Sequence, residues 1–143
     1  MIYMASTGIP AEKTAGQIQA LIGKWASHVM CEYENGEVTG LAFQIKHKDK
    51  SIPFLLPIRW QPVLETMKQN KKTPRHLCNP EQARKVAWRQ IYRWVEAQLA
   101  LIETGIVDAK EVFMPYILLD IEKKTTLYTS LETKNFKAIG WEG

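Results

Sequence analysis

The stretch from Asn79 to Gly105, NPEQARKVAWRQIYRWVEAQLALIETG, predicts one long helix around which the rest of the chain packs. Asn79 can cap the first free amides, Pro80 suits the first helical position, and Gln82 can complete a capping box. Gly105 can adopt the left-handed conformation that ends a helix. Apolar side chains between these signals recur at helical spacing on one broad face: Ala83, Ala87, Ile91, Trp94, Val95, Leu99 and Ile102. We therefore expect protein to cover most of this helix.

A charged stripe occupies the rest of the helix, at steps of three or four residues. Its members are Lys85, Arg89, Arg93 and Glu96. Tyr92 borders the stripe, and its ring is a candidate for stacking on a nucleic-acid base. Trp94 belongs to the apolar face instead, so we expect it in the core.

The length and composition indicate one globular domain. A chain of 143 residues can bury its own core, and 45% hydrophobic and 24% charged residues are ordinary values. We expect a single domain over 1–143, with 1–10 and 129–143 loosely ordered. No apolar run approaches the roughly 20 residues that span a bilayer, and the first residues lack a signal-peptide pattern. Because Cys31 and Cys78 make no disulfide framework, we predict a cytoplasmic protein without a membrane partner.

Basic residues concentrate in the middle of the chain. Residues 46–93 hold 12 of the 19 lysines and arginines and only three acids, whereas the flanking segments are acidic overall. A basic region between acidic ends is typical of a protein with a polyanionic partner. The alternative is that folding interleaves these charges into a mixed surface that is merely solvated.

A hairpin is predicted ahead of the long helix, because residues 28–33 and 38–46 alternate like strands around Glu34-Asn35-Gly36-Glu37. A two-residue Asn-Gly turn would pair Glu34 with Glu37 and place the apolar residues of the two strands on opposite faces. A three-residue loop, with Gly36 left-handed in a bulge, places them all on one face. We choose the second turn, which brings together Val29, Cys31, Tyr33, Leu41, Phe43 and Ile45.

The other face of this hairpin carries mostly small or polar residues: Met30, Glu32, Val38, Gly40, Ala42 and Gln44. Gly40 and Ala42 would let a ligand or a partner approach the sheet closely. The alternative is a plain solvent-facing surface.

Four further segments are predicted ahead of the long helix. A helix is expected before the hairpin, ending near Ser27, and a third strand is expected at 51–58. Pro53 and Pro57 cannot donate backbone hydrogen bonds, so this strand should lie at an edge of the sheet. A short helix at 61–69 and a basic loop then lead into the long helix.

The segments after Gly105 complete an α+β fold. Asp108 and Glu111 can form the capping box of a short helix, and residues 116–128 can form a hairpin. The predicted architecture is an N-terminal helix, a three-stranded antiparallel meander, a short helix and the long central helix packed on the sheet, followed by a small C-terminal helix and hairpin.

The sequence contains no Gly-rich phosphate loop and no nucleophile elbow. His76 and Cys78 are two residues apart without a second such pair, which is a weak zinc pattern. Four acids that are near in sequence could hold Mg²⁺ for phosphodiester cleavage: Glu96, Glu103, Asp108 and Glu111. Each of them also suits a helix cap or a solvated helix face. We therefore predict no catalytic residue, no metal and no cofactor.

Four segments, ARKVAWR (83–89), WVEAQLALIETG (94–105), EVFMPY (111–116) and PFLLP (53–57), carry a resemblance to other proteins. From about Glu12 to Tyr128 the chain resembles a family of small proteins carried by bacterial prophages and other mobile elements. The resemblance implies no particular activity and no functional residue. Phage-type genes often act on DNA, so it supports a DNA partner by association alone.

These observations predict a non-enzymatic accessory protein that binds DNA or RNA, with single strands as one option, through its basic middle. Tyr92 would stack on a base, and the predicted phosphate contacts are Lys46, Lys48, Lys50, Lys71, Lys72, Arg75, Lys85, Arg89 and Arg93. One alternative is a homo-oligomer or partner-binding protein whose sheet face meets another subunit. Another is a metal-dependent nuclease.

Overall fold

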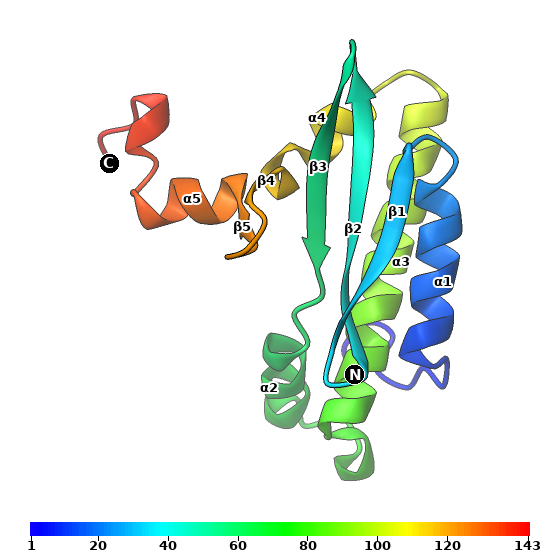
Figure 1. Cartoon of the computed structure of the whole chain (residues 1–143). Coiled ribbons are helices and arrows are strands. Elements are labelled where there is room, and N and C mark those ends of the chain that lie inside the picture. The colour runs from blue at the N-terminus through cyan, green and yellow to red at the C-terminus, as the bar shows by residue number, and fades with distance from the viewer.

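A three-stranded antiparallel sheet with two helices on one face forms the body of the protein in the computed structural model, which describes all 143 residues (Figure 1). The strands are β1 (His28–Glu34), β2 (Glu37–His47) and β3 (Lys50–Pro57), and they lie side by side in that order. The two helices are α1 (Ala11–Ile22) and α3 (Pro80–Glu103). The predicted α+β architecture is confirmed.

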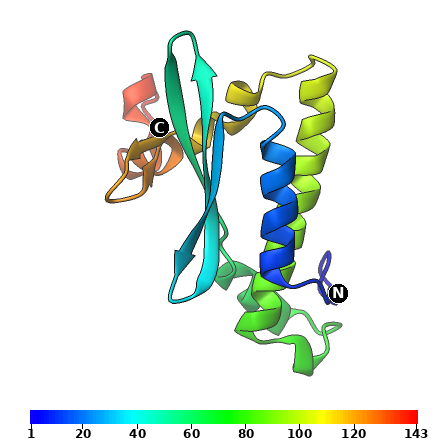
Figure 2. The ribbon, with the colours of Figure 1, turned by 45° about the vertical axis from the view of Figure 1, so that its right-hand side comes forward.

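Shorter elements connect and extend this body. Between β3 and α3 lie α2 (Gln61–Gln69) and the 3-10 turn η1 (Arg75–Leu77). After α3 the chain forms α4 (Ala109–Phe113) and η2 (Met114–Tyr116). The segment from Leu118 to Gly143, which we call the C-terminal arm, contains β4 (Leu118–Asp120), β5 (Thr125–Thr126), α5 (Leu127–Thr133) and η3 (Lys137–Ile139). Figure 2 shows α1 and α3 on one side of the sheet and this arm on the other.

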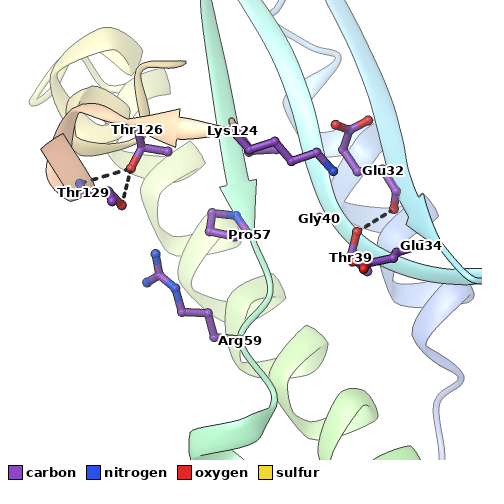
Figure 3. A pocket seen from close by; sticks show the side chains of 10 residues that line it. Glu32, Glu34, Thr39, Gly40, Pro57, Arg59, Lys124, Thr126 and Thr129 are labelled. Atoms are coloured by element: carbon purple, nitrogen blue, oxygen red, sulfur yellow. Dashed lines mark hydrogen bonds between the residues drawn. The ribbon is translucent and has the colours of Figure 1, made fainter. Parts of the chain in front are cut away.

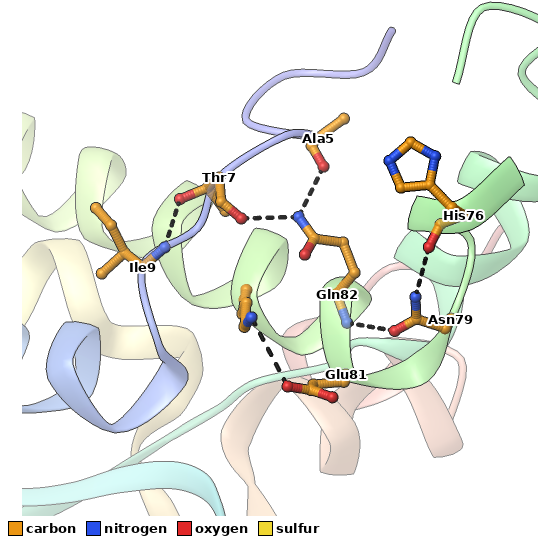
Figure 4. A network of polar contacts seen from close by, with 8 residues as sticks. Ala5, Thr7, Ile9, His76, Asn79, Glu81 and Gln82 are labelled. Carbon is orange, nitrogen blue, oxygen red and sulfur yellow. Dashed lines mark hydrogen bonds and ion pairs between the residues drawn. The ribbon is translucent and has the colours of Figure 1, made fainter. Parts of the chain in front are cut away.

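The predicted ends of α3 are confirmed, with one correction. The Asn79 side chain accepts a hydrogen bond from the Gln82 amide at 2.9 Å, and Gly105 is left-handed with φ +79°. The Gln82 side chain does not close a capping box, because its amide donates instead to the carbonyls of Ala5 and Thr7, at 2.9 and 2.8 Å (Figure 4). These bonds tie the first residues to α3, and Ala5 is buried.

The core lies between the sheet and the two helices. Phe43 stacks on Phe54 with ring centroids 5.1 Å apart, and Phe113 from α4 packs against Phe43, Trp25 and Trp94. Burying such a side chain contributes roughly 1.5–3 kcal/mol. The other fully buried large side chains include Ile18, Ile22, Leu41, Leu56, Trp88 and Val95. Trp94, predicted in the core, packs on Phe113 and is partly buried.

The β1–β2 turn differs from the one that we predicted. Asn35 and Gly36 both have positive φ and form a two-residue turn, so Glu34 pairs with Glu37. The extra residue is Thr39, between the Tyr33–Val38 and Glu32–Gly40 pairs, and this bulge restores the predicted facing from Cys31 onward.

Because of that bulge, Val38 turns toward the helices. It is 3% exposed and belongs to the core rather than to the outer face on which we had placed it. Asn35 and Gly36 can adopt the positive φ angles of a two-residue turn without strain. The chain therefore keeps this turn, and the register shifts further along β2.

The edge position of β3 is confirmed. Phe54 forms an isolated bridge with Ile117, which brings the start of the C-terminal arm beside this edge. The second strand of the hairpin predicted at 116–128 is only two residues long, because the Thr126 hydroxyl accepts a hydrogen bond from the Thr129 amide at 3.3 Å and begins α5. Residues 129–143 are not without structure: Phe136 packs between Tyr128 and Trp141.

Candidate functional site

Six of the nine cations predicted to contact phosphate are exposed and form no ion pair. Three of them, Lys46, Lys48 and Lys50, lie at the β2–β3 turn, and we call them the hairpin lysines. The other three, Lys71, Lys72 and Arg75, lie between α2 and α3, and we call them the loop cations. The two groups lie at opposite ends of the molecule (Figure 1). The helix α3, which runs along the direction that separates them, spans 24 residues and is about 36 Å long.

Arg89 is not part of a free surface, contrary to our prediction. Its side chain is only 5% exposed because α1 packs over that side of α3. Its Nη1 donates to Gln17 Oε1 at 2.6 Å and to Thr14 Oγ1 at 3.4 Å. Its Nε has no partner, and no carboxylate lies within ion-pair distance. Arg89 is therefore a buried cation that holds α1 to α3 through neutral groups.

The other two cations of the predicted stripe form ion pairs with glutamates of their own helix. Lys85 pairs with Glu81 at 3.7 Å, and Arg93 pairs with Glu96 at 3.0 Å. The hydrogen bond from Arg93 to Glu96 raises the pKa of Arg93 above its ordinary value. The stripe predicted on α3 is therefore not a continuous free basic surface.

Tyr92 does not present an open stacking platform. The guanidinium groups of Arg89 and Arg93 lie over its ring, 4.3 and 5.6 Å from the centroid. Its hydroxyl also donates to Glu96 at 3.3 Å. A base would have to displace these cations, so the structure does not support Tyr92 as a base-stacking residue.

The hairpin lysines sit on a ribbon that nothing else covers. All six residues from Lys46 to Ser51 are exposed, and Asp49 is the only acid among them. His47 pairs with Lys50 and Lys46 pairs with Ser51 across the ribbon. A two-stranded ribbon has dimensions that the major groove of B-DNA can admit.

The four acids considered for a metal do not gather into a site. Asp108 and Glu111 form the predicted capping box: Asp108 accepts from the Lys110 amide at 2.8 Å, and Glu111 accepts from the Asp108 amide at 3.2 Å. The backbone hydrogen bond from Lys110 lowers the pKa of Asp108. Glu96 is engaged by Arg93 and Tyr92. No three His, Cys, Asp or Glu side chains in the protein come close enough to share a metal ion.

A groove of about 560 Å³ lies on the outer face of the sheet, where the C-terminal arm forms one wall. Its apolar lining includes Met30, Ala42, Leu55, Leu118 and Ile121. Met30 is 59% exposed and Ile121 is 75% exposed. Large apolar side chains that gather in a groove while remaining exposed are typical of an interaction surface.

The glycine on this face has a packing role. A Cβ atom on Gly40 would lie 2.7 Å from the Leu56 carbonyl oxygen. Glycine is needed there so that β2 and β3 can approach each other, and the residue is buried. Ala42, by contrast, lines the groove as predicted for a small residue on the open face.

The groove continues into a smaller pocket of about 240 Å³ (Figure 3). Glu32 and Glu34 lie on the β1 side of this pocket, and Arg59 and Lys124 lie on the side of β3 and the arm. Lys124 points across the pocket toward Glu32, but none of the four charged side chains forms an ion pair within the chain. The lining from the arm was missed at the sequence level, because no local pattern says that residues 118–129 lie beside β3.

No protein-family model, curated protein or solved structure matches the chain. The resemblance to prophage-borne proteins therefore stays a prediction. None of the helices combines the length and the apolar character that crossing a bilayer requires.

Proposed function

We propose that this chain is a non-enzymatic DNA-binding protein that contacts phosphates with the hairpin lysines and the loop cations. The observation that carries the proposal is that these six cations are exposed and unpaired. The ion pairs of the protein use Lys85, Arg93 and Lys110, so all six of these cations are available to phosphates.

The spacing of the two groups favours a long duplex over a short strand. One base pair advances a duplex by about 3.4 Å, so about 10 base pairs are needed to reach across the roughly 36 Å length of α3. Single-strand binding normally adds aromatic stacking platforms, and Tyr92 is covered by guanidinium groups. We therefore favour duplex DNA among the nucleic acids.

The form of the duplex provides a second distinction. The β2–β3 ribbon can enter the major groove of B-DNA, which is about 12 Å wide. The major groove of A-form RNA is deep and narrow. The proposal therefore expects tighter binding to duplex DNA than to duplex RNA of the same length, with little dependence on sequence because phosphate contacts dominate.

The test is a salt series with labelled DNA. With six phosphate contacts, the logarithm of the binding constant should fall against the logarithm of salt concentration with a slope of about −5, whereas three contacts give about −3. A duplex of about 20 base pairs should show the steeper slope, and a stem-loop with about 6 base pairs should show the shallower one. Binding is measured by fluorescence anisotropy.

Two triple variants that remove the same amount of charge identify which surface binds DNA. Changing Lys46, Lys48 and Lys50 to Ala should reduce the slope on the long duplex to about −3. Changing Lys123, Lys134 and Lys137 to Ala removes the same charge from the C-terminal arm and should leave the slope near −5. Absence of binding at low salt, or equal losses in the two triple variants, would contradict the proposal.

A further inference from the structure

The outer face of the sheet has the chemistry of an interface that lacks its second half. Its centre is apolar: Met30 and Ile121 are exposed beside the small Ala42, and Leu55 forms the buried floor. The C-terminal arm also adds Leu118, which lines the groove and is partly exposed. On a monomer this apolar surface would face water, although the same chain buries its other large side chains efficiently against the opposite face of the sheet.

The charges around this centre are divided by sign. Glu32 and Glu34 lie at the β1 side, whereas Arg59 and Lys124 lie toward β3 and the arm (Figure 3). All four are free of ion pairs within the chain. A face with acids on one side and bases on the other is complementary to a second copy of itself.

We propose that two copies of this chain dimerise through their outer sheet faces. The two-fold axis lies between the sheets and runs parallel to the strands. This axis sets the β1 side of each copy against the arm side of the other, so that Glu34 faces the partner subunit's Lys124 twice. Closed two-fold contacts of this isologous kind are the commonest form of protein self-association.

The arm gives this dimer its shape. The arm stands out from the outer side of the sheet beside β3 (Figure 2), so it forms a wall on one side of the groove only. Under the proposed symmetry, each arm lies along the β1 edge of the other copy. The apolar side chains of Leu118 and Ile121, which line the groove, then meet the side of the partner sheet that carries its exposed methionine.

Dimerisation and DNA binding use different residues. None of the hairpin lysines or loop cations lines the groove or the smaller pocket. A variant that breaks the dimer therefore keeps its DNA contacts within each monomer, and a protein that fails to bind DNA can still dimerise. The two proposals can fail separately.

The first test is the mass of the full chain in solution as a function of concentration, measured by sedimentation velocity. The wild-type protein should shift from monomer to dimer as its concentration rises. Ala42→Arg places a long charged side chain at the apolar centre and should leave a monomer at every concentration. Ala97→Arg makes the same change at an exposed position of α3 and should dimerise like the wild type.

Charge reversal supplies a test that does not depend on disrupting the centre. Glu34→Lys and Lys124→Glu each set like charges together twice and should each weaken the dimer at least tenfold. The double variant Glu34→Lys/Lys124→Glu restores two opposite pairs and should recover most of the affinity. Mixing the two single variants also creates two opposite pairs, so it should produce a heterodimer from chains that self-associate only weakly.

Circular dichroism spectra and melting curves of each variant check that the chain is folded. A wild-type protein that remains monomeric at the highest soluble concentration would overturn the proposal. So would a dimer that persists in Ala42→Arg, or single variants that fail to form a heterodimer when mixed.

Discussion

The two faces of the sheet use alternate residues of the same strands, yet only one of them is closed. On the helix side, Leu41, Phe43 and Phe54 are buried under α1, α3 and α4. On the outer side, Met30 is exposed and Ala42 is only partly covered. The helix-side residues are large and interlocking, whereas the outer residues, apart from the buried Leu55, are small, flexible or charged. This contrast indicates that the helix side provides stability and that the outer side is available for association.

Truncation of one residue on each face should show the largest difference. Phe43→Ala removes a ring that packs on Phe54, Trp25 and Phe113 and should lower the free energy of unfolding by about 3–5 kcal/mol. Met30→Ala on the outer face should change it by less than about 0.5 kcal/mol. Urea denaturation at low protein concentration, where the monomer is being measured, gives both values. Similar losses in both variants would remove the proposed distinction between the faces.

Alanine substitutions at two glycines test whether the close approach of β2 and β3 requires a glycine at Gly40. Gly40→Ala pushes a Cβ atom against the Leu56 carbonyl oxygen, and it should destabilise the protein by about 1–3 kcal/mol. Gly16→Ala is the matched control, because that Cβ meets open space in the middle of α1. It should stabilise the protein by about 0.5–1 kcal/mol. A neutral Gly40→Ala would instead favour our earlier interpretation of Gly40 as a residue that gives a ligand access.

Much of the fold could be predicted because its signals are local. Asn79 and Gly105 mark the ends of α3, the proline spacing of β3 marks an edge, and Asp108 and Glu111 mark α4. The position of the β1–β2 bulge could not be predicted, because a three-residue loop at Gly36 and a two-residue turn followed by a bulge at Thr39 give the same facing from Cys31 onward. The apolar pattern predicts which residues share a face, but not the residue at which the register shifts.

The candidate surfaces were harder to predict because they depend on what covers them. Periodicity places Arg89 beside Lys85 and Arg93 on one stripe, but it does not show that α1 lies over part of that stripe. The outer groove depends on contacts between β3 and the C-terminal arm, more than 60 residues later in the chain. Neither the cover over Arg89 nor the wall of the groove has a signal in the local sequence.

Substitution of Arg89 tests the contact between α1 and α3 selectively, and its expected effect on stability is small. It is the only charged side chain among the buried residues, and its partners Gln17 and Thr14 are neutral. Methionine keeps much of the aliphatic volume and removes the desolvated charge, while the half-buried Gln17 can turn toward water. Arg89→Met should therefore change the free energy of unfolding by less than about 1.5 kcal/mol, whereas Arg89→Ala leaves a void and should lower it by about 2 kcal/mol or more.

The same variant separates a buried cation from a surface cation in DNA binding. Because Arg89 is enclosed between α1 and α3, Arg89→Met should leave the affinity for a long duplex and its salt slope unchanged. Lys48→Ala removes one exposed phosphate contact and should reduce the magnitude of the slope by about 0.9. Anisotropy measurements on the two folded variants compare them directly. If Arg89→Met reduced the magnitude of the salt slope as much as Lys48→Ala does, α1 would have to move away from α3 when DNA binds. Arg89 would then belong to the DNA-binding surface.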